Sequence, residues 1–480
     1  MSKYIFLSLL GIVLAAGPAG CTLAPKYTRP EAPVPGRWPD GDAYRGVPAA
    51  DGAAATAELP WREFFTDPSL QQVIGTALAN NRDLRLAALN VEMARALYGI
   101  QRQELYPTLY ATGGGGKQRA SADLTGLGQP RTTEQYNANL GILSWELDFF
   151  GRVRSLKDEA LETYLATREA RRGAQVLLVS AVANAYLALA ADREGLALAE
   201  NTLKSQQSSY ELVRRQHELG VATELDLRRV EITLETARGE MIRYTRQAAQ
   251  SENALAFLVG APVPPELLPA ELGRIRPPRE LAPALPSAVL LARPDISEAE
   301  HQLMGAHAFI GAARAAFFPS ISLTTALGTA SNELAGLFKS GTGTWNYSAQ
   351  LAMPIFDART WSAYRVSNVQ REMALLRYER AIQNAFREVA DALAVRGTVD
   401  RQLAAQQALV AALSETHRLA QFRFERGVDS YLGVLDAQRS LFGAQQGLVS
   451  LRLAQLASQV QLYAALGGGG LEEPAAPAAE

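Results

Sequence analysis

Apolar and polar residues alternate along residues 345–355, which predicts a β-strand with one apolar and one polar face. Residues 136–149 alternate as well but change phase near Ser144 and Trp145, where we expect a β-bulge. Two further strands are predicted at 108–116 and 320–330. In the strand predicted at 345–355, the apolar face would carry Trp345, Tyr347, Ala349, Leu351, Met353 and Ile355. Its polar face would carry Asn346, Ser348, Gln350 and Ala352.

Strands with an apolar face and a face of small polar groups suit a sheet that separates lipid from a watery lumen. An ordinary soluble sheet would show the same alternation, so the pattern leaves both interpretations open. Four strands are too few to close a barrel, because about eight is the lower limit. A membrane-spanning barrel would therefore have to be shared between several chains.

Proline is absent from two long tracts, between Pro130 and Pro262 and between Pro354 and Pro474. Both tracts are rich in Ala, Leu, Glu, Gln and Arg, which favour helices, whereas an interior proline breaks a helix. Residues 152–219 alone would form a helix of roughly 100 Å at about 1.5 Å per residue. Helices of this length exceed those of globular domains and indicate a repeat, a coiled coil or a tunnel.

The two tracts belong to an internal repeat. The segment 83–107, which runs from an Asp to a Pro, is matched 212 residues later by 295–319. The sequence G-V-A-T-E-L at 220–225 is matched 207 residues later by G-V-D-S-Y-L at 427–432. The division predicted from this repeat is a first repeat at 61–261, a linker at 262–294, a second repeat at 295–470 and a disordered tail at 471–480.

Each half contains a helical hairpin with a tight tip. Gly220 and Gly427 should end the long helices, because glycine takes the left-handed conformation at a helix C-terminus without a side-chain penalty. Thr223 and Ser430 then offer N-cap oxygens to the next helix. Either tip alone fits an ordinary helix-turn-helix loop, but two matching tips indicate a surface presented to a partner. The tip residues are Gly220, Val221 and Thr223 in the first half and Gly427, Val428 and Ser430 in the second.

Beside the second tip, Leu432, Asp436 and Arg439 are spaced by four and three residues, which places them on one face of a helix. One interpretation is an exposed ion pair within that helix, which would contribute only a few tenths of a kcal/mol. The first half lacks this acid and base pair, and its corresponding residues are Leu225, Arg229 and Ile232.

Charge and composition argue against a nucleic-acid partner and against helices that span a membrane. The 480 residues include 47 basic and 49 acidic side chains, which gives no electrostatic reason to expect a nucleic acid as partner. Beyond the N-terminus, we expect no uncharged apolar run of about 18 residues, the length of a transmembrane helix. If the chain crosses a membrane, it should do so by strands.

The N-terminus is typical of an export signal, with Lys3 followed by an apolar segment at 4–16. Cys21 then resembles the end of a bacterial lipobox, where cleavage precedes the cysteine and lipid is attached to it. We expect a lipoprotein signal peptide at 1–20 and a lipidated, extended, proline-rich arm at 21–60. The alternative is an ordinary signal peptide with an incidental thiol, although this cysteine is the only one in the chain. Apart from that lipid, no cofactor is expected.

No pattern of catalytic or metal-binding residues is recognisable, so we do not expect an enzyme. Neither a phosphate-binding glycine loop nor a G-x-S-x-G elbow occurs. The glycines at 113–116 lie in a predicted strand, where close backbone packing explains them better than phosphate binding. Metal-ligand spacing is absent among the histidines, which are His217, His301, His307 and His417.

Three segments resemble the outer-membrane factors of tripartite efflux pumps, the TolC/OprM/NodT family. They are C-T-L-A-P-K-Y-T-R-P at 21–30, R-F-E-R-G-V-D-S-Y-L-G-V-L-D-A-Q-R-S-L at 423–441 and L-Y-A-A-L-G-G at 462–468. The resemblance covers about residues 21–470 and implies a mainly α-helical fold with a β-barrel portion. It implies a homotrimer with four strands per chain in one twelve-stranded outer-membrane barrel, above a periplasmic tunnel of duplicated helical hairpins.

The resemblance also implies partners and residue roles. A periplasmic adaptor (membrane fusion) protein is expected on the tips, an inner-membrane RND-type transporter beneath it, and outer-membrane lipid around the barrel. In OprM-like members, the positions that match Leu432, Asp436 and Arg439 line or brace a constricted periplasmic mouth, so these residues are expected to form a gate. The implied function is an exit duct for drugs and other amphiphiles. Alternatives are a duct for metal cations or secreted polypeptides and, remotely, a non-conducting helical scaffold of the envelope.

Overall fold

The computed structural model describes residues 22–45, 59–125, 128–281 and 293–468, so Cys21 lies outside the described residues. The chain divides into two compact units. Both halves of the sequence contribute to each unit, so the units do not coincide with the sequence repeats, whose exact boundaries stay a prediction. Unit 1 comprises residues 1–30, 90–167 and 298–378, and unit 2 comprises residues 31–89, 168–297 and 379–480.

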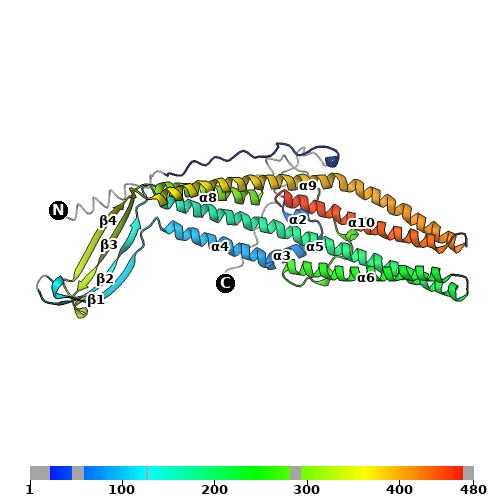
Figure 1. Cartoon of the computed structure of the whole chain (residues 1–480), viewed down its shortest axis with the longest axis horizontal. Helices are drawn as coiled ribbons and strands as arrows, with labels where there is room; N and C mark the ends of the chain where they lie inside the picture. The colour runs from blue at the N-terminus through cyan, green and yellow to red at the C-terminus, as the bar shows by residue number, and fades with distance from the viewer. Residues whose placement is uncertain (1–21, 46–58, 126–127, 282–292, 469–480) are drawn as a thin grey trace. The chain divides into compact units, whose positions relative to one another are not determined.

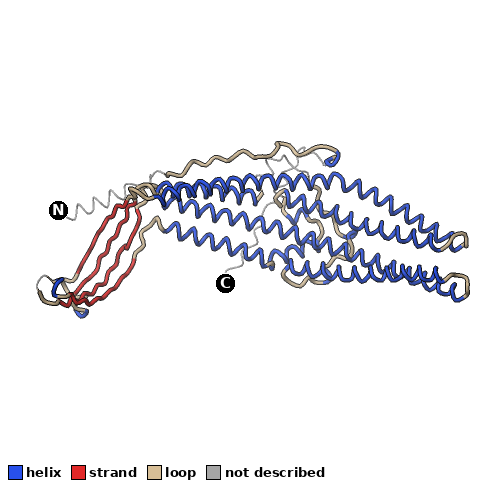
Figure 2. The backbone as a smooth tube through the Cα atoms, in the orientation of Figure 1, coloured by secondary structure: helices blue, strands red, loops and turns tan. Residues whose placement is uncertain are grey.

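The described part of the chain is mainly helical, with four strands (Figures 1 and 2). The strands are β1 (Tyr110–Ala120), β2 (Arg131–Glu146), β3 (Ser320–Ser331) and β4 (Gly343–Ala352). The helices are α2 (Trp61–Phe64), α3 (Pro68–Asn80), α4 (Arg82–Gln103), α5 (Arg152–Glu218), α6 (Glu224–Val259), α8 (Pro294–Ala315), α9 (Ala358–Glu425) and α10 (Tyr431–Ala465).

The order of elements in the first half recurs in the second half. Helices α4 and α8 each have 22 residues, α5 and α9 have 67 and 68, and α6 and α10 have 36 and 35. Each long helix turns back into the shorter helix that follows it, α5 into α6 and α9 into α10 (Figure 1). The duplicated hairpins are therefore confirmed, as is the prediction that the proline-free tracts form very long helices.

The expectation that no helix is apolar enough to span a bilayer is wrong for α5. This helix contains a window with a mean hydropathy of 1.7, and no charged residue occurs from Gly173 to Ala191. Of that window, 56% is buried, and Leu178, Val182 and Leu187 belong to the core of unit 2. Packing within unit 2 accounts for the apolar stretch, as in the core helix of any large domain.

The core of unit 2 is built around three aromatic rings that are distant in sequence. Phe64 stacks on Tyr463 with ring centroids 4.3 Å apart and an interplanar angle of 6°. Phe65 meets the edge of the same tyrosine at 5.9 Å. All three side chains are buried, so the segment before α3 is fixed against the end of α10 by a large apolar contact.

The four strands form one antiparallel sheet in the order β1-β2-β3-β4, all within unit 1. The pairing gathers apolar side chains on one face, where Leu327 lies between Leu140 of β2 and Trp345 of β4. The opposite face carries small and polar groups, as where Thr324 lies opposite Ser348. The sheet therefore has the two chemically different faces that the alternation predicted.

Strand β2 contains the expected β-bulge. Its register against β3 shifts between Ile142, which lies opposite Thr325, and Trp145, which lies opposite Leu323. Because successive side chains alternate, an unbroken strand would turn Trp145 to the polar face and Glu146 to the apolar face. The extra residue of the bulge returns the tryptophan to the apolar face.

The strands β1 and β2 are longer than predicted at the ends joined by their connecting loop. Strand β1 extends to Ala120 and β2 begins at Arg131, beyond the predicted limits of 116 and 136. Polar residues extend the pairing there, including an ion pair between Lys117 and Glu134. Hydrophobic alternation carries no signal in a polar stretch, so the sequence pattern missed these residues.

Strands β1 and β4 are the edges of the sheet, and neither pairs with another described strand on its outer side. Strand β4 ends at Ala352, so Met353 and Ile355, expected in the strand, lie beyond it. Pro354 between them has no N–H to continue a ladder. Ile355 and Phe356 are each 96% exposed, so this flank of the sheet is uncovered by the residues that the structure describes.

The start of each 22-residue helix is tied to the end of the last helix in the same half. Asn81 donates from Nδ2 to the carbonyl oxygen of Leu258 at 2.8 Å, and Arg293 donates from Nη1 to that of Ala465 at 2.6 Å. The two acceptors are 207 residues apart, so these bonds occupy matching places in the repeat. Arg293 is buried and also forms an ion pair with Glu388 at 2.8 Å.

The described part of the N-terminal arm, residues 22–45, is extended apart from one short 3-10 turn, as predicted. In unit 1, Arg29 makes two hydrogen bonds to the carboxylate of Glu300, at 2.7 and 2.8 Å, and the Tyr27 hydroxyl donates to it at 2.9 Å. Burial and this hydrogen bond raise the pKa of Tyr27. In unit 2, Trp38 stacks on Phe386 at 5.0 Å. The arm thus packs on helices in each unit.

We predict that Arg293→Ala lowers the free energy of unfolding by about 2 to 3 kcal/mol. The substitution leaves the carbonyl oxygen of Ala465 without this donor, and it leaves the half-exposed carboxylates of Asp295 and Glu388 without their ion-pair partner. Chemical unfolding in detergent, followed by circular dichroism, measures the loss. Arg274→Ala is the matched control, since Arg274 pairs with Glu271 on the surface and should change stability by less than about 0.5 kcal/mol. Equal effects of the two variants would contradict the buried role of Arg293.

Candidate functional site

The two hairpin tips end their long helices with the same hydrogen-bond pattern. In each tip the glycine N–H donates to the carbonyl three residues earlier, at 2.9 Å for Gly220 and 2.8 Å for Gly427. The N–H of the following valine donates to the carbonyl five residues earlier, at 2.8 Å for Val221 and 3.0 Å for Val428. The glycines have φ values of 73° and 71°, the left-handed conformation that this Schellman motif requires.

The N-caps after the two turns differ. The Thr223 hydroxyl and N–H donate to the carboxylate of Asp226 at 2.6 and 3.2 Å, as part of a capping box. These hydrogen bonds hold the pKa of Asp226 below its usual range. Ser430 occupies the N-cap position, but its side chain makes no capping hydrogen bond, which corrects that part of the prediction. The second tip is closed instead by an ion pair between Asp429 and Arg423 at 2.5 Å.

Apolar side chains stand exposed on both tips. Leu219 and Val221 of the first tip are 79% and 75% exposed, and Val428 of the second is 61% exposed. The turns beneath them are fixed by hydrogen bonds, so little conformational entropy would be lost if a partner covered these side chains. The arrangement suits a docking surface, although the use of the tips stays a prediction.

The predicted gate residues Leu432, Asp436 and Arg439 lie together on the exposed face of α10. Arg439 donates from Nη2 to Asp436 Oδ1 at 2.9 Å, and both side chains are well exposed. The opposite face of α10 is buried, including Val434 and Leu435. One chain thus presents this ion pair on a free helix surface, and its role as a gate stays a prediction.

The buried face of α10 joins the two hairpins near their tips. Leu435 packs with Val213 of α5 and Val230 of α6 in one cluster. Gln438 donates to the hydroxyl oxygen of Ser205 at 3.2 Å. No sequence pattern predicts this contact between Gln438 and Ser205, although Gln438 lies in the run 423–441 and is four residues from the buried Val434.

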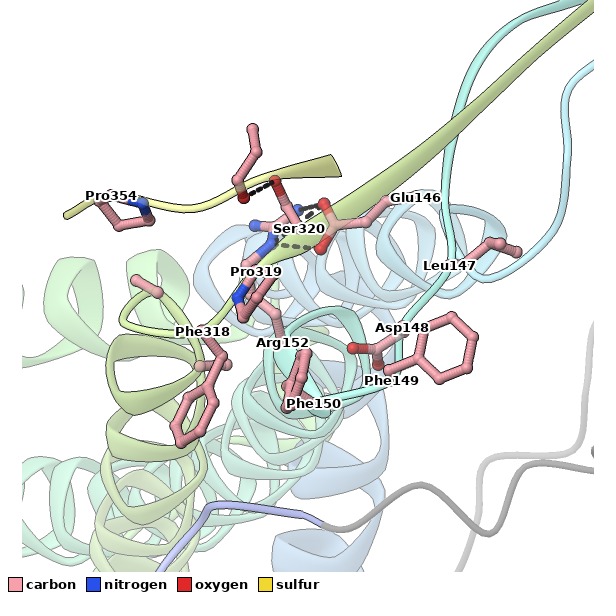
Figure 3. Close-up of a pocket in the computed structure, with 13 residues that line it drawn as sticks. Glu146, Leu147, Asp148, Phe149, Phe150, Arg152, Phe318, Pro319, Ser320 and Pro354 are labelled. Atoms are coloured by element: carbon pink, nitrogen blue, oxygen red, sulfur yellow. Dashed lines mark hydrogen bonds and ion pairs between the residues drawn. The ribbon is translucent and has the colours of Figure 1, made fainter. Parts of the chain in front are cut away.

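A pocket lies where the sheet meets the helices of unit 1 (Figure 3). The guanidinium of Arg152 faces the carboxylate of Glu146, with Nη2 and Oε2 2.6 Å apart, and the rings of Phe150 and Phe318 stack at 4.9 Å. The residues that line it lie in the described part of the chain and include no histidine or cysteine. The ion pair and the stacked rings fix the turns between strands and helices.

Among the residues that the structure describes, no group of three or more His, Cys, Asp or Glu side chains could hold a metal ion. Two of the histidines make local contacts instead. His301 lies 2.7 Å from Glu162, and His217 lies 3.3 Å from Glu224 at the first tip. These contacts join neighbouring helices.

The sheet has one apolar face, one polar face and two edges that no other described strand pairs, and the helical hairpins are very long. This combination suits a channel-forming protein of a bacterial envelope. The family model described as outer membrane efflux protein matches residues 73–261 and 285–468. The chain is 50% identical over 456 residues to two proteins of Pseudomonas putida, the toluene efflux pump outer membrane protein TtgC and the antibiotic efflux pump outer membrane protein ArpC. The match covers 95% of this chain and 94% of each relative.

The open state of the MtrE outer membrane channel of Neisseria gonorrhoeae has a similar fold, with a TM-score of 0.84 and 38% sequence identity. The likeness covers 94% of this chain and 98% of that chain. The chain belongs to the outer membrane efflux protein family. It is an outer-membrane protein and the exit duct of an efflux system, which confirms the family, fold class and location predicted from the sequence.

We predict that Thr223→Ala destabilises the first turn of α6 by about 1 kcal/mol, because it removes the capping box. Hydrogen exchange of the amides at the starts of α6 and α10 measures the effect, as faster exchange at the first tip. Ser430→Ala is the matched control and should leave exchange at α10 nearly unchanged, since that side chain makes no capping bond. Equal acceleration at both tips would contradict the difference between the caps.

Proposed function

We propose that three copies of this chain form the exit duct of a tripartite efflux pump. The four-stranded sheet carries the proposal, because its apolar face suits lipid and its polar face suits a watery lumen. Its two open edges need partners inside a membrane, where water cannot satisfy them. Three copies supply twelve strands, enough to close a barrel surrounded by outer-membrane lipid.

The hairpin tips are the proposed docking sites for a periplasmic adaptor (membrane fusion) protein. The exposed Leu219, Val221 and Val428 support this, since they offer apolar contacts on rigid turns. An inner-membrane RND-type transporter beneath the adaptor would deliver the substrate. Selection of the substrate would then occur before the duct.

Drugs, solvents and other amphiphiles are the proposed substrates. The relatives TtgC and ArpC are named for toluene and antibiotic efflux, respectively. The polar face of the sheet carries neutral residues of small or medium size, such as Asn139, Ser348 and Gln350. A lumen lined in this way suits a water-filled passage that does not strongly select substrates by charge. In this proposal the chain itself catalyses no reaction.

Deletion of the gene tests the proposal. Loss of the chain should lower tolerance to toluene and to antibiotics, and the wild-type gene should restore it. Ser348→Asp, on the polar face, should restore tolerance, whereas Leu351→Asp, on the apolar face, should fail because it places a charge against lipid. Unchanged tolerance in the deletion strain, with no redundant duct expressed, would rule out the proposed substrates.

The second functional prediction concerns closure of the free duct by Leu432, Asp436 and Arg439. Three copies of each residue around one axis would narrow the water path, and adaptor binding would favour the open arrangement. Asp436→Ala with Arg439→Ala should raise the single-channel conductance of the isolated protein, and Leu432→Ser should raise it further.

The matched control for the gate is Glu415→Ala with Arg418→Ala, which removes an exposed ion pair of 2.7 Å spaced by three residues on α9. Its conductance should equal that of the wild type. If the triple gate variant also conducts like the wild type while remaining folded, these residues are ordinary helix surface.

The third functional prediction is lipid attachment at Cys21, which would anchor the proline-rich arm to the outer membrane. Mass spectrometry of the mature N-terminal peptide should show Cys21 as the first residue with the added mass of acyl chains. A peptide that runs through an unmodified Cys21 would contradict the lipoprotein assignment.

A further inference from the structure

The apolar face of the sheet changes its chemistry along β1. Ala111 lies opposite Leu140 and belongs to this face, and so does every second residue after it, because side chains alternate along a strand. These residues are Gly113, Gly115, Lys117 and Arg119. The face that suits lipid therefore ends in two basic side chains.

These basic side chains lie at the end of the sheet that points away from the helices. Strand β1 leads into β2 at this end, and β3 leads into β4 at the same end, whereas the opposite end of the sheet leads to the helices of unit 1 (Figure 2). The helices belong to the periplasmic part of an outer-membrane protein. The end with Lys117 and Arg119 therefore meets the outer leaflet of the outer membrane.

The height of the apolar band places the basic side chains at the level of the lipid headgroups. On β3 the apolar face runs from Ile321 to Ser331, ten residues later. At about 3.3 Å per residue and a strand tilt of about 40°, this stretch is about 25 Å tall, which is the height of the apolar band on an outer-membrane barrel. Ser331 lies opposite Tyr136, and Tyr136 lies opposite Gly115. The two basic residues follow two and four positions beyond that glycine, just outside the band.

Tyr136 marks the boundary of the band. Its ring covers Gly115, because a Cβ atom on that glycine would come within 2.8 Å of the ring. Its hydroxyl donates to Glu134 Oε2 at 3.4 Å, and Glu134 forms an ion pair with Lys117 on the opposite strand. An aromatic ring against apolar surface with its hydroxyl toward charged groups is typical of the interface between lipid tails and headgroups.

Basic charge exceeds acidic charge just beyond this boundary. We call Lys117, Arg119 and Glu134 the rim. Lys117 is 67% exposed in spite of its ion pair, and Arg119 is exposed and lies opposite Thr132, which carries no charge. The rim of each chain therefore has one net positive charge. A guanidinium matches the geometry of a phosphate, and an ammonium beside it adds a point charge.

We propose that Lys117 and Arg119 bind a phosphate group of lipopolysaccharide. The outer leaflet of a bacterial outer membrane consists largely of this lipid, whose lipid A part carries phosphates on its sugars directly above the acyl chains. The acyl chains would cover the apolar face below Tyr136, and the phosphate would then reach the level of the rim. The inference rests on the proposed function, which turns the apolar face of the sheet toward lipid.

Lipid binding to the full-length mature protein tests the proposal. Native mass spectrometry in detergent, with purified lipid A and with EDTA to remove bridging cations, measures the apparent affinity. Arg119→Gln should weaken binding by about 5-fold, and Lys117→Gln with Arg119→Gln by about 10- to 30-fold. Arg119→Lys should lose less than about 2-fold, because it keeps the charge. Unchanged binding by the double variant overturns the proposal.

Arg131→Gln is the matched control. Arg131 lies at the same end of the sheet and opposite Ala120, but on the polar face. The variant removes the same charge at nearly the same height, and it should bind lipid A like the wild type. If Arg131→Gln weakens binding as much as Arg119→Gln does, the effect comes from net charge and the proposed site on the lipid-facing side is wrong.

Glu134→Gln should change the affinity in the opposite direction. Its carboxylate repels phosphate and occupies a donor of Lys117, so removal of this charge should tighten the binding of lipid A by about 2- to 5-fold. If Glu134→Gln instead weakens binding, the ion pair serves to hold the two strands together, and the rim is not a phosphate site.

Two other lipids distinguish the source of the phosphate. Lipid A without its phosphates should bind the wild type and the double variant equally, since only its acyl chains and sugars remain. Phosphatidylglycerol should bind the wild type more weakly than lipid A and should depend less on the rim. If phosphatidylglycerol loses as much affinity as lipid A in the double variant, the rim binds anionic lipid in general and the assignment to lipopolysaccharide is wrong.

Conductance and mass of the same preparations separate this inference from the proposed function. The double variant should remain a trimer and conduct like the wild type, because the rim lies on the lipid-facing side of the sheet. If the wild type is a conducting trimer and the rim variants all bind lipid A equally, the inference fails and the proposed function stands. If the wild type is not a trimer, both fail.

Discussion

Backbone N–H and carbonyl groups at a strand edge need partners, and within lipid no water is available to supply them. The sheet of unit 1 has such groups along β1 and β4, and four strands cannot close upon themselves. The bulge in β2 agrees with a sheet that meets lipid on one side, because it keeps Trp145 on the apolar face. The assembly of several copies thus follows from the number of strands in one chain.

The two halves share one order of elements, but they have also diverged. Glu300 on α8 binds the arm through Arg29, whereas the matching position on α4 is Ala88. The capping box of Thr223 belongs to the first tip alone, and the ion pair of Asp436 and Arg439 belongs to the second half alone. The two halves therefore share one fold, whereas the contact with the N-terminal arm and the ion pair of the proposed gate each occur in the second half alone.

Sequence reasoning predicted the long helices best, because proline-free tracts permit them and a glycine ends each one. Helix α5 ends at Glu218, one residue before the predicted limit, and Gly220 follows in the left-handed conformation. Sequence reasoning also predicted the bulge from the change of phase at Ser144, since alternation has only two phases. It missed the polar ends of β1 and β2, where pairing between strands extends them without hydrophobic alternation. The prediction that Ser430 caps α10 with its side chain was wrong, because a suitable residue type does not fix a side-chain rotamer. The contact between Gln438 and Ser205 was missed, because it depends on a neighbouring hairpin that local sequence patterns do not encode.

We infer that a conducting duct requires sheets from three chains. Native mass spectrometry of the mature protein in detergent, combined with bilayer conductance of the same preparation, tests it most directly. We expect a species of three chains, each of 51.8 kDa less the signal peptide and plus any lipid, and conductance only from that species. A stable monomer that conducts ions would contradict it.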